Sequence, residues 1–245
     1  NSDSSLYQPF SIFLEFLPTK HVQPVPSHIA GYPVMMTIAD RVRTDDDPEP
    51  LAIAQNYAAE IPKVLHFSGK GRDIKDFNCF IQAAQNKGYS NVLLLTGDKL
   101  KQHQNGQGIN SPHTRYLESV NAVMQSKKLA PEIKVGVALN PFKYAYAEHA
   151  AQYYKLDKKV HAGADYVITQ LGFDLEALKQ AKQYLDDYHT GVDLYACVMP
   201  LTLARAEFMD KYKVAGIVLT PHLLELLKQE QESNLTVTEQ NVYAR

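Results

Sequence analysis

Short apolar runs recur along the chain, and a polar residue or a glycine closes each one before a helix-like stretch begins. The runs cover residues 10–18, 33–40, 63–69, 91–98, 134–142, 165–174 and 193–201. They are nearly continuous in apolar residues rather than alternating, which is typical of strands covered on both faces. The pattern therefore predicts seven buried strands.

The segments between these runs carry apolar residues three and four positions apart, the spacing of an amphipathic helix. The clearest are "DIKDFNCFIQAAQNKG", "HTRYLESVNAVMQSKK", "YAEHAAQYYKLDKKVHAG" and "DLEALKQAKQYLDDYH". Strands that alternate with helices form right-handed βαβ units and a parallel sheet. Two architectures satisfy this order, an open doubly wound sheet and a closed (β/α)8 barrel.

A glycine-rich phosphate-binding turn would favour the open sheet, but the chain has none at a strand end. No G-x-G-x-x-G sequence opens a helix after a strand, and "GKGRD" at 69–73 has the wrong spacing. The fold class that we predict is α/β, a (β/α)8 TIM barrel. We expect a single catalytic domain over residues 1–245, a size that such barrels commonly have.

Charge and cysteine content limit the partners. The chain has 25 Lys and Arg against 27 Asp and Glu, a formal net charge of -2, which argues against nucleic acid or a membrane surface as a partner. Two lone cysteines, Cys79 and Cys197, fit neither a disulfide framework nor a zinc site. No apolar run approaches the roughly 20 residues that span a bilayer. We expect a cytoplasmic protein that binds no metal ion. The sequence is compatible with a homo-oligomer and does not fix the oligomeric state.

Polar residues stand near the predicted carboxyl ends of the strands, where a barrel carries its chemistry. They are Glu15, Thr37, His66, Asp98, Asn140, Gln170 and Thr202. Strand ends are often polar simply because they meet solvent, so each of these residues also has a purely structural explanation.

Glu15 is the strongest candidate, because it lies inside "FLEFLP" between Phe13, Leu14, Phe16 and Leu17. A carboxylate among such neighbours loses hydration, which favours the protonated form and raises its pKa. A general acid is produced in this way. The alternative is a glutamate paired with a buried Lys or Arg, a partner that the sequence does not identify.

Four motifs together resemble the methylenetetrahydrofolate reductase family. They are "FLEFLP", "VLLLTGD", "GVALNPF" and "KKVHAGADYVITQLGFD", in the same order as in the family, and the resemblance covers about residues 11 to 200. It implies a barrel that binds a flavin, FAD or FMN, at the carboxyl ends of its strands. It also implies that NADH or NADPH reduces the flavin, which passes a hydride to 5,10-methylenetetrahydrofolate. The product, 5-methyltetrahydrofolate, belongs to one-carbon metabolism and serves methionine biosynthesis.

The resemblance assigns roles to residues that bind or convert the folate. Glu15 takes the position of the general acid that protonates the bridge nitrogen of the folate. Asp98, directly after Gly97, takes that of an aspartate close to both flavin and pterin. Gln170 matches a glutamine that hydrogen-bonds the pterin, whose mixed edge of donors and acceptors suits an amide.

The resemblance also places a group of residues against the flavin. These are Thr37, His66, Thr96, Gly97, Asp98, Leu139 and Lys159. A packed neutral histidine at 66 and a solvated helix-end lysine at 159 are the structural alternatives. Family members carry Arg at the position of Thr96 and Tyr at that of Leu139. Losing a guanidinium removes a hydrogen bond worth about 1.5–3 kcal/mol, so we expect the flavin to be held weakly.

The end of the chain departs from the family pattern. By pattern alone, residues 215–221 could form an eighth strand, whereas by resemblance they form the connector before the helix-like "HLLELLKQEQ". The polar tail "ESNLTVTEQNVYAR" supplies no convincing strand. The closing strand of the barrel is therefore expected to be missing from this chain or atypical in it.

Two further function classes stand beside the reductase. One is a folate-binding methyltransferase or corrinoid-linked partner that has lost its flavin, and the other is a non-catalytic subunit of a larger complex. Thr96 and Leu139 favour these classes. Glu15, Asp98 and Gln170 together favour the reductase, because the acid has no task without hydride transfer.

Overall fold

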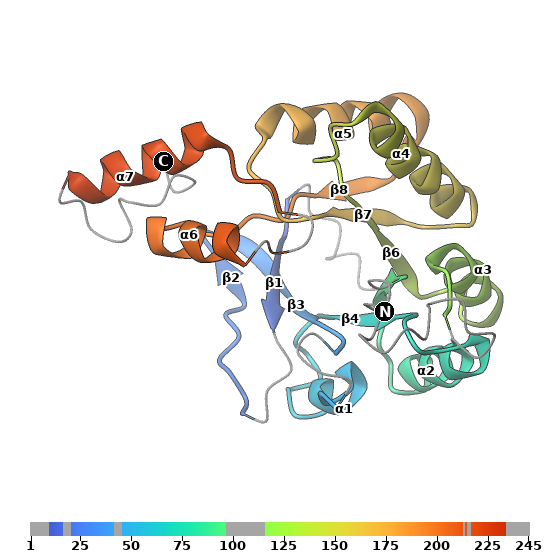
Figure 1. Cartoon of the computed structure of the whole chain (residues 1–245). Coiled ribbons are helices and arrows are strands. Elements are labelled where there is room, and N and C mark those ends of the chain that lie inside the picture. The colour runs from blue at the N-terminus through green and yellow to red at the C-terminus, as the bar shows by residue number, and fades with distance from the viewer. Residues whose placement is uncertain are drawn as a thin grey trace, which may run out of the picture. The chain divides into compact units, whose positions relative to one another are not determined.

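The computed structural model describes residues 10–16, 21–41, 46–96, 116–212, 214 and 217–233. The chain divides into two compact units. The first comprises Asn1–Val137 and Lys158–Asp165, and the second comprises Ala138–Asp157 and Tyr166–Arg245. Each unit is described by itself, with the elements labelled as in Figure 1.

The first unit is built on a parallel sheet. Its strands, in spatial order, are β1 (Ile12–Phe16), β3 (Tyr32–Ile38), β4 (Lys63–Ser68), β5 (Asn91–Leu95) and the start of β6 (Lys134–Leu139). The short β2 (His28–Ile29) pairs with the start of β3 in the antiparallel direction. Parallel neighbours at successive positions are the product of repeated βαβ crossovers.

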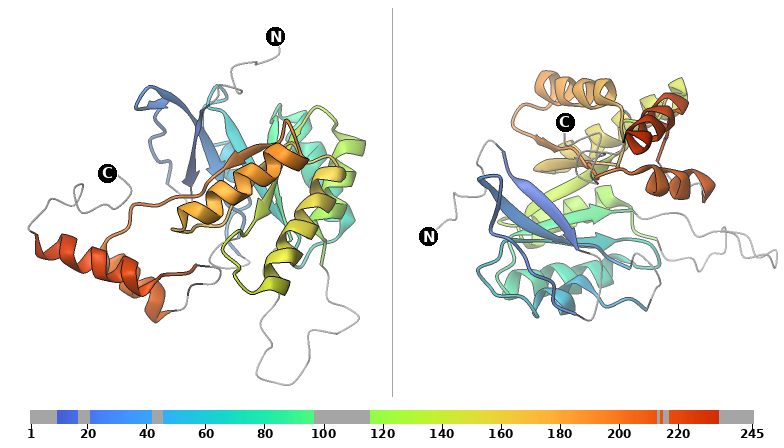
Figure 2. Two further views of the ribbon diagram at one scale, coloured as in Figure 1. Left: turned by 90° about the horizontal axis from the view of Figure 1, so that it is seen from above. Right: turned by 90° about the vertical axis from the view of Figure 1, so that its left-hand side faces the viewer.

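Helices cover one side of this sheet, as the views in Figure 2 show. They are α1 (Pro50–Ala54), α2 (Ile74–Asn86) and α3 (Ser119–Leu129), with the last turn of α4 (Tyr146–His161) in the same unit. The core between α2 and the sheet contains fully buried Phe77 and Ile81 from the helix. The ring of Phe67 on β4 packs against Phe77 at a centroid distance of 5.1 Å.

The second unit contains the end of β6 and most of α4, followed by β7, α5, β8, α6 and α7. The bounds are β7 Tyr166–Thr169, α5 Leu175–Tyr188, β8 Asp193–Tyr195, α6 Leu203–Lys211 and α7 Pro221–Glu232. Strand β7 pairs in parallel with β8. Helices α6 and α7 pack around a buried cluster formed by Leu201, Ala206, Leu223 and Leu227.

The predicted order of elements is confirmed. Each of the seven apolar runs contains a strand, and each of the four helix-like segments contains a helix. Within the described part of 215–221 there is no strand, and α7 begins where the helix was expected. No closing strand is found among the described residues.

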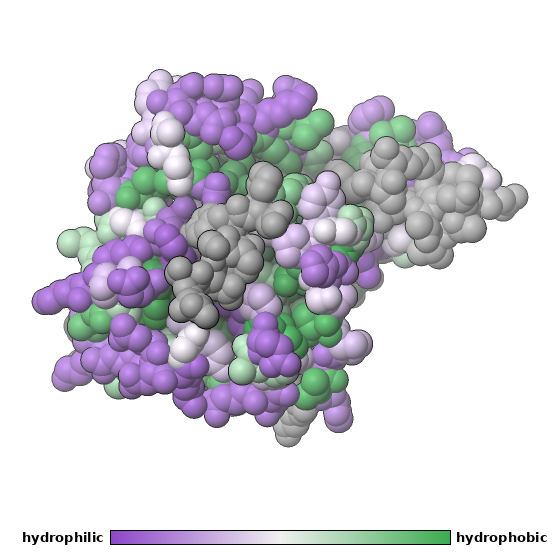
Figure 3. All heavy atoms as spheres, turned by 180° about the vertical axis from the view of Figure 1, so that it is seen from behind, coloured by the Kyte–Doolittle hydropathy of each residue, from purple (hydrophilic) through white to green (hydrophobic). Residues whose placement is uncertain are grey.

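Figure 3 shows one face of the molecule, on which hydrophobic residues are interspersed among hydrophilic ones. Large apolar side chains that reach solvent include Met124 on α3, Tyr154 on α4 and Tyr188 on α5. None of the described helices is both long and apolar enough to cross a bilayer. Across the same residues, no three His, Cys, Asp or Glu side chains gather into a group that could hold a metal ion.

Candidate functional site

Three predicted site residues share one face of the sheet in the first unit. Glu15 on β1 is level with Thr37 on β3. Thr37 is in turn level with Val64 on β4, two positions before His66. Side chains two positions apart lie on the same face of a strand. The structure therefore brings Glu15, Thr37 and His66 to one face, toward the carboxyl ends of three successive strands.

Glu15 is exposed to solvent, so the prediction that Phe13 and Phe16 enclose it is wrong, and Leu17, the third expected neighbour, lies outside the described residues. Side chains alternate along a strand, and Phe16 is buried on the opposite face from Glu15. Partial desolvation by the surrounding protein still raises the pKa of Glu15 above 4.5, the direction that we predicted. Solvent reaches one side of the group, so the shift reflects crowding by protein rather than full enclosure. No ion-pair partner for Glu15 exists among the described residues.

Thr37 and His66 are buried, with relative exposures of 4% and 8%. Burial lowers the pKa of His66 to about 4, and the charge of Asp40 opposes this shift only in part. The ring is therefore neutral at neutral pH. Its Nε2 atom is buried and has no hydrogen-bond partner in the described structure. An orphaned buried nitrogen of this kind fits a site that awaits a polar group from a ligand.

Thr96 holds the start of helix α3. Its hydroxyl donates to Ser119 Oγ at 3.0 Å, and its Oγ1 accepts the backbone N–H of Ser119 at 3.1 Å. The first N–H groups of a helix have no partner inside the helix, so this bond satisfies one of them. The Thr96 side chain thus has a structural task. The next two predicted residues, Gly97 and Asp98, lie outside the described part of the chain.

Gln170 directly follows β7 in the second unit. Its backbone N–H donates to the carbonyl of Leu139 at 2.8 Å, and its side-chain Oε1 accepts the N–H of Leu171 at 2.9 Å. The amide acceptor is thereby used locally, while the Nε2 donors have no partner among the described residues. The buried hydroxyl of Thr169 accepts the N–H of Cys197 at 2.9 Å. The side chain of Leu139 is fully buried in the core.

The turn after Gln170 depends on a glycine. A Cβ atom added to Gly172 would lie 2.1 Å from the ring of Phe142, so no side chain fits there. The N–H of Phe142 donates to Asn140 Oδ1 at 3.0 Å. Thr202 caps α6, with its Oγ1 accepting the N–H of Arg205 at 3.4 Å. The polar residues at 140 and 202 therefore have local structural roles.

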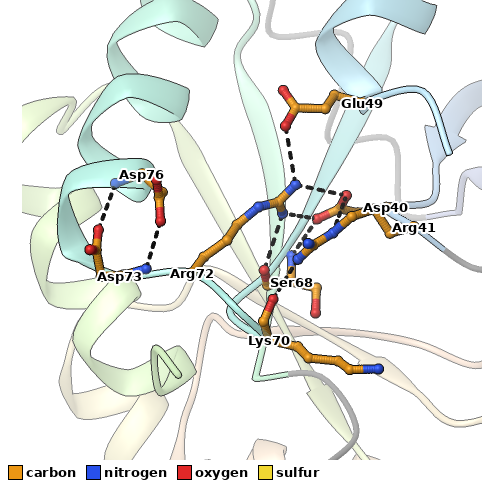
Figure 4. A network of polar contacts seen from close by, with 8 residues as sticks. All are labelled: Asp40, Arg41, Glu49, Ser68, Lys70, Arg72, Asp73 and Asp76. Carbon is orange, nitrogen blue, oxygen red and sulfur yellow. Dashed lines mark hydrogen bonds and ion pairs between the residues drawn. The ribbon is translucent and has the colours of Figure 1, made fainter. Parts of the chain in front are cut away.

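Sequence reasoning missed a buried charge network at the carboxyl ends of β3 and β4 (Figure 4). Asp40 pairs with Arg72, and the N–H of Ser68 also donates to Asp40 Oδ2 at 2.7 Å. Arg41 donates to the carbonyl of Lys70 at 2.5 Å. The signal was a charged residue just beyond each of two neighbouring strands, although their pairing depends on tertiary structure.

The family of the chain follows from a comparison with known proteins. A model of the family "Methylenetetrahydrofolate reductase" matches residues 19–243. The chain belongs to this family. It is 22% identical over 184 residues to "Methylenetetrahydrofolate reductase 1" of Schizosaccharomyces pombe. The aligned residues are 75% of this chain but only 30% of that relative. The chain thus spans less than a third of the length of this curated member.

A solved structure also resembles the chain. It is that of an uncharacterized protein from Clostridium thermocellum that binds two copies of 5-methyl-5,6,7,8-tetrahydrofolic acid. The TM-score is 0.62 at 17% sequence identity, and the match covers 89% of this chain and 75% of the other. Together with the parallel strands that alternate with helices in this chain, this likeness confirms the predicted (β/α)8 barrel class.

Lys159, a predicted flavin contact of the methylenetetrahydrofolate reductase family, lies apart from Glu15 within the first unit. It belongs to the last turn of α4, whose end leads to Asp165. The N–H of Asp165 donates to the carbonyl of Val135, near the amino end of β6, at 2.7 Å. Lys159 therefore lies toward the amino ends of the strands, whereas Glu15 lies near the carboxyl end of its strand. Its contact with a flavin phosphate stays a prediction.

Some of the predicted flavin contacts are available to a ligand, whereas others are engaged within the protein. The unpartnered ring nitrogen of His66 can accept from or donate to a polar ring edge. The hydroxyl of Thr96, by contrast, is committed to α3, and the side chain of Leu139 is committed to the core. The described residues thus fit a flavin that is bound without a cation at position 96.

Proposed function

We propose that the protein is a flavin-dependent reductase that converts 5,10-methylenetetrahydrofolate to 5-methyltetrahydrofolate with NADH or NADPH. The observation that carries this proposal is Glu15, a carboxyl of raised pKa that no described residue neutralises. A carboxyl that keeps its proton to higher pH can act as a general acid. Family membership gives that acid a reaction in which it is needed.

Folate is the substrate class that the comparisons support. The chain is a member of the methylenetetrahydrofolate reductase family, and the similar Clostridium thermocellum protein binds a reduced methylated folate. Such a pterin presents donors and acceptors along one edge, and the free Nε2 donors of Gln170 suit its acceptors. The cytoplasm is the location that goes with this function.

Each residue has a defined part in the proposed reaction. A bound flavin would accept a hydride from the nicotinamide and pass it to the one-carbon unit of the folate. Glu15 donates its proton to the bridge nitrogen of the folate as the ring opens. Gln170 orients the pterin through its Nε2 donors. Thr37 and His66 contact the flavin, and Asp98 is the further residue that the family resemblance adds.

An absorption spectrum of the purified protein tests this proposal. Bands of a flavin that are released on denaturation, and that bleach anaerobically on addition of NADH or NADPH, are the expected result. The bleached protein should recover its bands when methylenetetrahydrofolate is added. If protein incubated with FAD and with FMN binds neither, the reductase proposal fails.

One observation favours a second candidate function, a folate-binding protein that has lost its flavin. The hydroxyl of Thr96 caps α3 where family members supply a guanidinium, so the described site lacks that charge-assisted donor. Such a protein would be a methyltransferase, a corrinoid-linked partner or a non-catalytic subunit. Calorimetric binding of 5-methyltetrahydrofolate to a protein that takes up no flavin would support this candidate over the reductase.

A further inference from the structure

A small cavity lies in the second unit, between the segments that follow β6 and β7 and the start of α7. Its volume is about 250 Å³. Three aromatic side chains line it, those of Phe142, Tyr144 and Phe173, and Leu223 of α7 is among the apolar residues that complete the wall. Phe142 and Leu223 are buried, whereas Tyr144 is 59% exposed. The cavity therefore has a buried apolar part and an aromatic ring that solvent reaches.

The charged residues that line this cavity are acidic. They are Asp174 and Glu176, at the start of α5. Glu176 forms an ion pair with Lys179 at 2.8 Å, and both of these side chains are more than half exposed. Among the described residues that line the cavity there is no Lys, Arg or His, and no described cation lies within ion-pair distance of Asp174. The cavity therefore carries a net negative charge, which is due mainly to Asp174.

The Asp174 carboxylate is fixed in place by two neutral donors. Its Oδ1 accepts the N–H of Ala177 at 3.1 Å, and its Oδ2 accepts the hydroxyl of Tyr144 at 2.8 Å. Burial and this second bond raise the pKa of Tyr144 to about 12, so the phenol keeps its proton and adds no charge. The amino end of α5 supplies only about half a positive charge. A carboxylate that is only partly offset therefore remains in the wall that the three rings share.

This lining suits an organic cation better than a metal ion. Hard metal ions need several oxygen ligands, and the described residues contain no group of three His, Cys, Asp or Glu side chains that could hold one. Faces of aromatic rings attract alkylated ammonium groups through the ring quadrupole, without hydrogen bonds. Each oxygen of Asp174 already accepts a bond, so the carboxylate acts mainly through its charge.

We propose that this cavity binds a small quaternary ammonium compound, with its alkylated nitrogen against the rings of Phe142, Tyr144 and Phe173 and its charge offset by Asp174. The volume of about 250 Å³ lies below the roughly 300–1,000 Å³ of sites for drug-sized ligands, so the ligand is a small one. The inference does not rest on the proposed reductase and holds whether or not the protein binds a flavin.

Choline is the probe that tests this inference, with 3,3-dimethylbutan-1-ol as a neutral molecule of the same shape. Titration of each compound, followed by saturation-transfer difference NMR of its methyl groups, gives both affinities. Choline should bind at least about tenfold more tightly, because only the cation is attracted by the rings and the carboxylate. Equal affinities of the two compounds, or an absence of choline binding, would overturn the inference.

Two variants tie the binding to this cavity. Asp174→Asn removes the charge and keeps a residue that caps helices well, and its choline affinity should fall by about tenfold. Asp186→Asn, at an exposed carboxylate of the same helix, is the matched control and should bind choline as the parent does. Tyr144→Leu removes an exposed ring, should also weaken choline binding, and is the variant to measure where Asp174→Asn does not fold. Parent-like choline affinity in either folded variant would overturn the assignment.

Discussion

Glu15 and Thr37 stand side by side at the same level of neighbouring parallel strands, β1 and β3. One side chain is exposed and ionisable, and the other is buried and neutral. The pair therefore forms a boundary on this face of the sheet, with solvent at β1 and a closed interior from β3 onward.

Replacement of Glu15 by Gln keeps the size of the side chain and removes its transferable proton. In the proposed reductase, reduction of the flavin by the nicotinamide involves no folate and should survive. Reoxidation by methylenetetrahydrofolate should slow by about 10²–10⁴-fold, the usual contribution of a general acid. Rapid-mixing absorbance of the flavin measures each half-reaction alone. Glu207→Gln, a change at an exposed glutamate of α6, is the matched control, and equal reoxidation rates in both variants would rule Glu15 out as the acid.

Two substitutions at Gln170 separate its structural hydrogen bond from its proposed ligand contact. Glu at this position keeps an acceptor for the N–H of Leu171 and removes the Nε2 donors. Folate affinity should fall by about 1–3 kcal/mol in Gln170→Glu, with a melting temperature close to that of the parent. Gln170→Ala should weaken folate binding similarly and lower stability as well, because the Leu171 N–H loses its partner. Calorimetry with 5-methyltetrahydrofolate provides the test, and unaltered affinity in Gln170→Glu would make the amide purely structural.

Ala at position 172 should destabilise the second unit, since its Cβ would collide with the ring of Phe142. Overpacking of this kind typically costs about 1–3 kcal/mol. Urea denaturation would measure the loss. Combining Gly172→Ala with Phe142→Ala removes the clash, so the double variant should lose less than the sum of the two single losses. Additive losses would contradict the close contact.

The lowered pKa of His66 predicts a loss of stability in mild acid. The unfolded chain binds a proton near pH 6.5, whereas the folded protein does so only near pH 4. Stability contributed by the neutral ring is therefore fully present above pH 6.5 and is lost as the pH falls toward 4. The shift corresponds to about 3 kcal/mol over this window.

Denaturation by urea at several pH values measures this slope. The His66→Gln variant cannot take up the proton and should lack this part of the pH dependence. His222→Gln, at an exposed histidine of α7, should retain it. A parent-like slope in His66→Gln would show that other groups cause the acid sensitivity.

The cap formed by Thr96 can be tested by comparing two small substitutions. Thr96→Val removes the hydroxyl that bonds to Ser119 and should cost about 0.5–2 kcal/mol, as lost helix caps do. Thr96→Ser keeps the hydroxyl and should cost less. Thermal unfolding followed by circular dichroism compares the two, and a Thr96→Val protein as stable as the parent beside a destabilised Thr96→Ser would mean that the methyl group, not the hydroxyl, stabilises this position.

The strands could be predicted from the sequence because burial on both faces makes each one an almost unbroken apolar run. Their ends were harder to place. The run at 193–201 continues past β8, which ends at Tyr195, since the N–H of Cys197 bonds to the side chain of Thr169 instead of continuing the ladder. The hydrophobic pattern alone does not show which hydrogen-bond partner a backbone N–H will have, so it does not fix where a strand ends.

The candidate site was only partly accessible to sequence reasoning. Position at a strand end selected Glu15, Thr37 and His66, which the structure indeed places on one face. The enclosure of Glu15 was misjudged, because neighbours in sequence point to opposite faces of a strand. The pairing of Asp40 with Arg72 joins residues from different loops, and no local pattern specifies such a contact.

The chain passes between its two compact units three times, after Val137, Asp157 and Asp165. The short return segment Lys158–Asp165 is anchored in the first unit, where Asp165 accepts from Lys127 at 2.6 Å. A single break in the gene therefore cannot separate the two units cleanly. Recombination at one crossover point would leave a piece of one unit joined to the other.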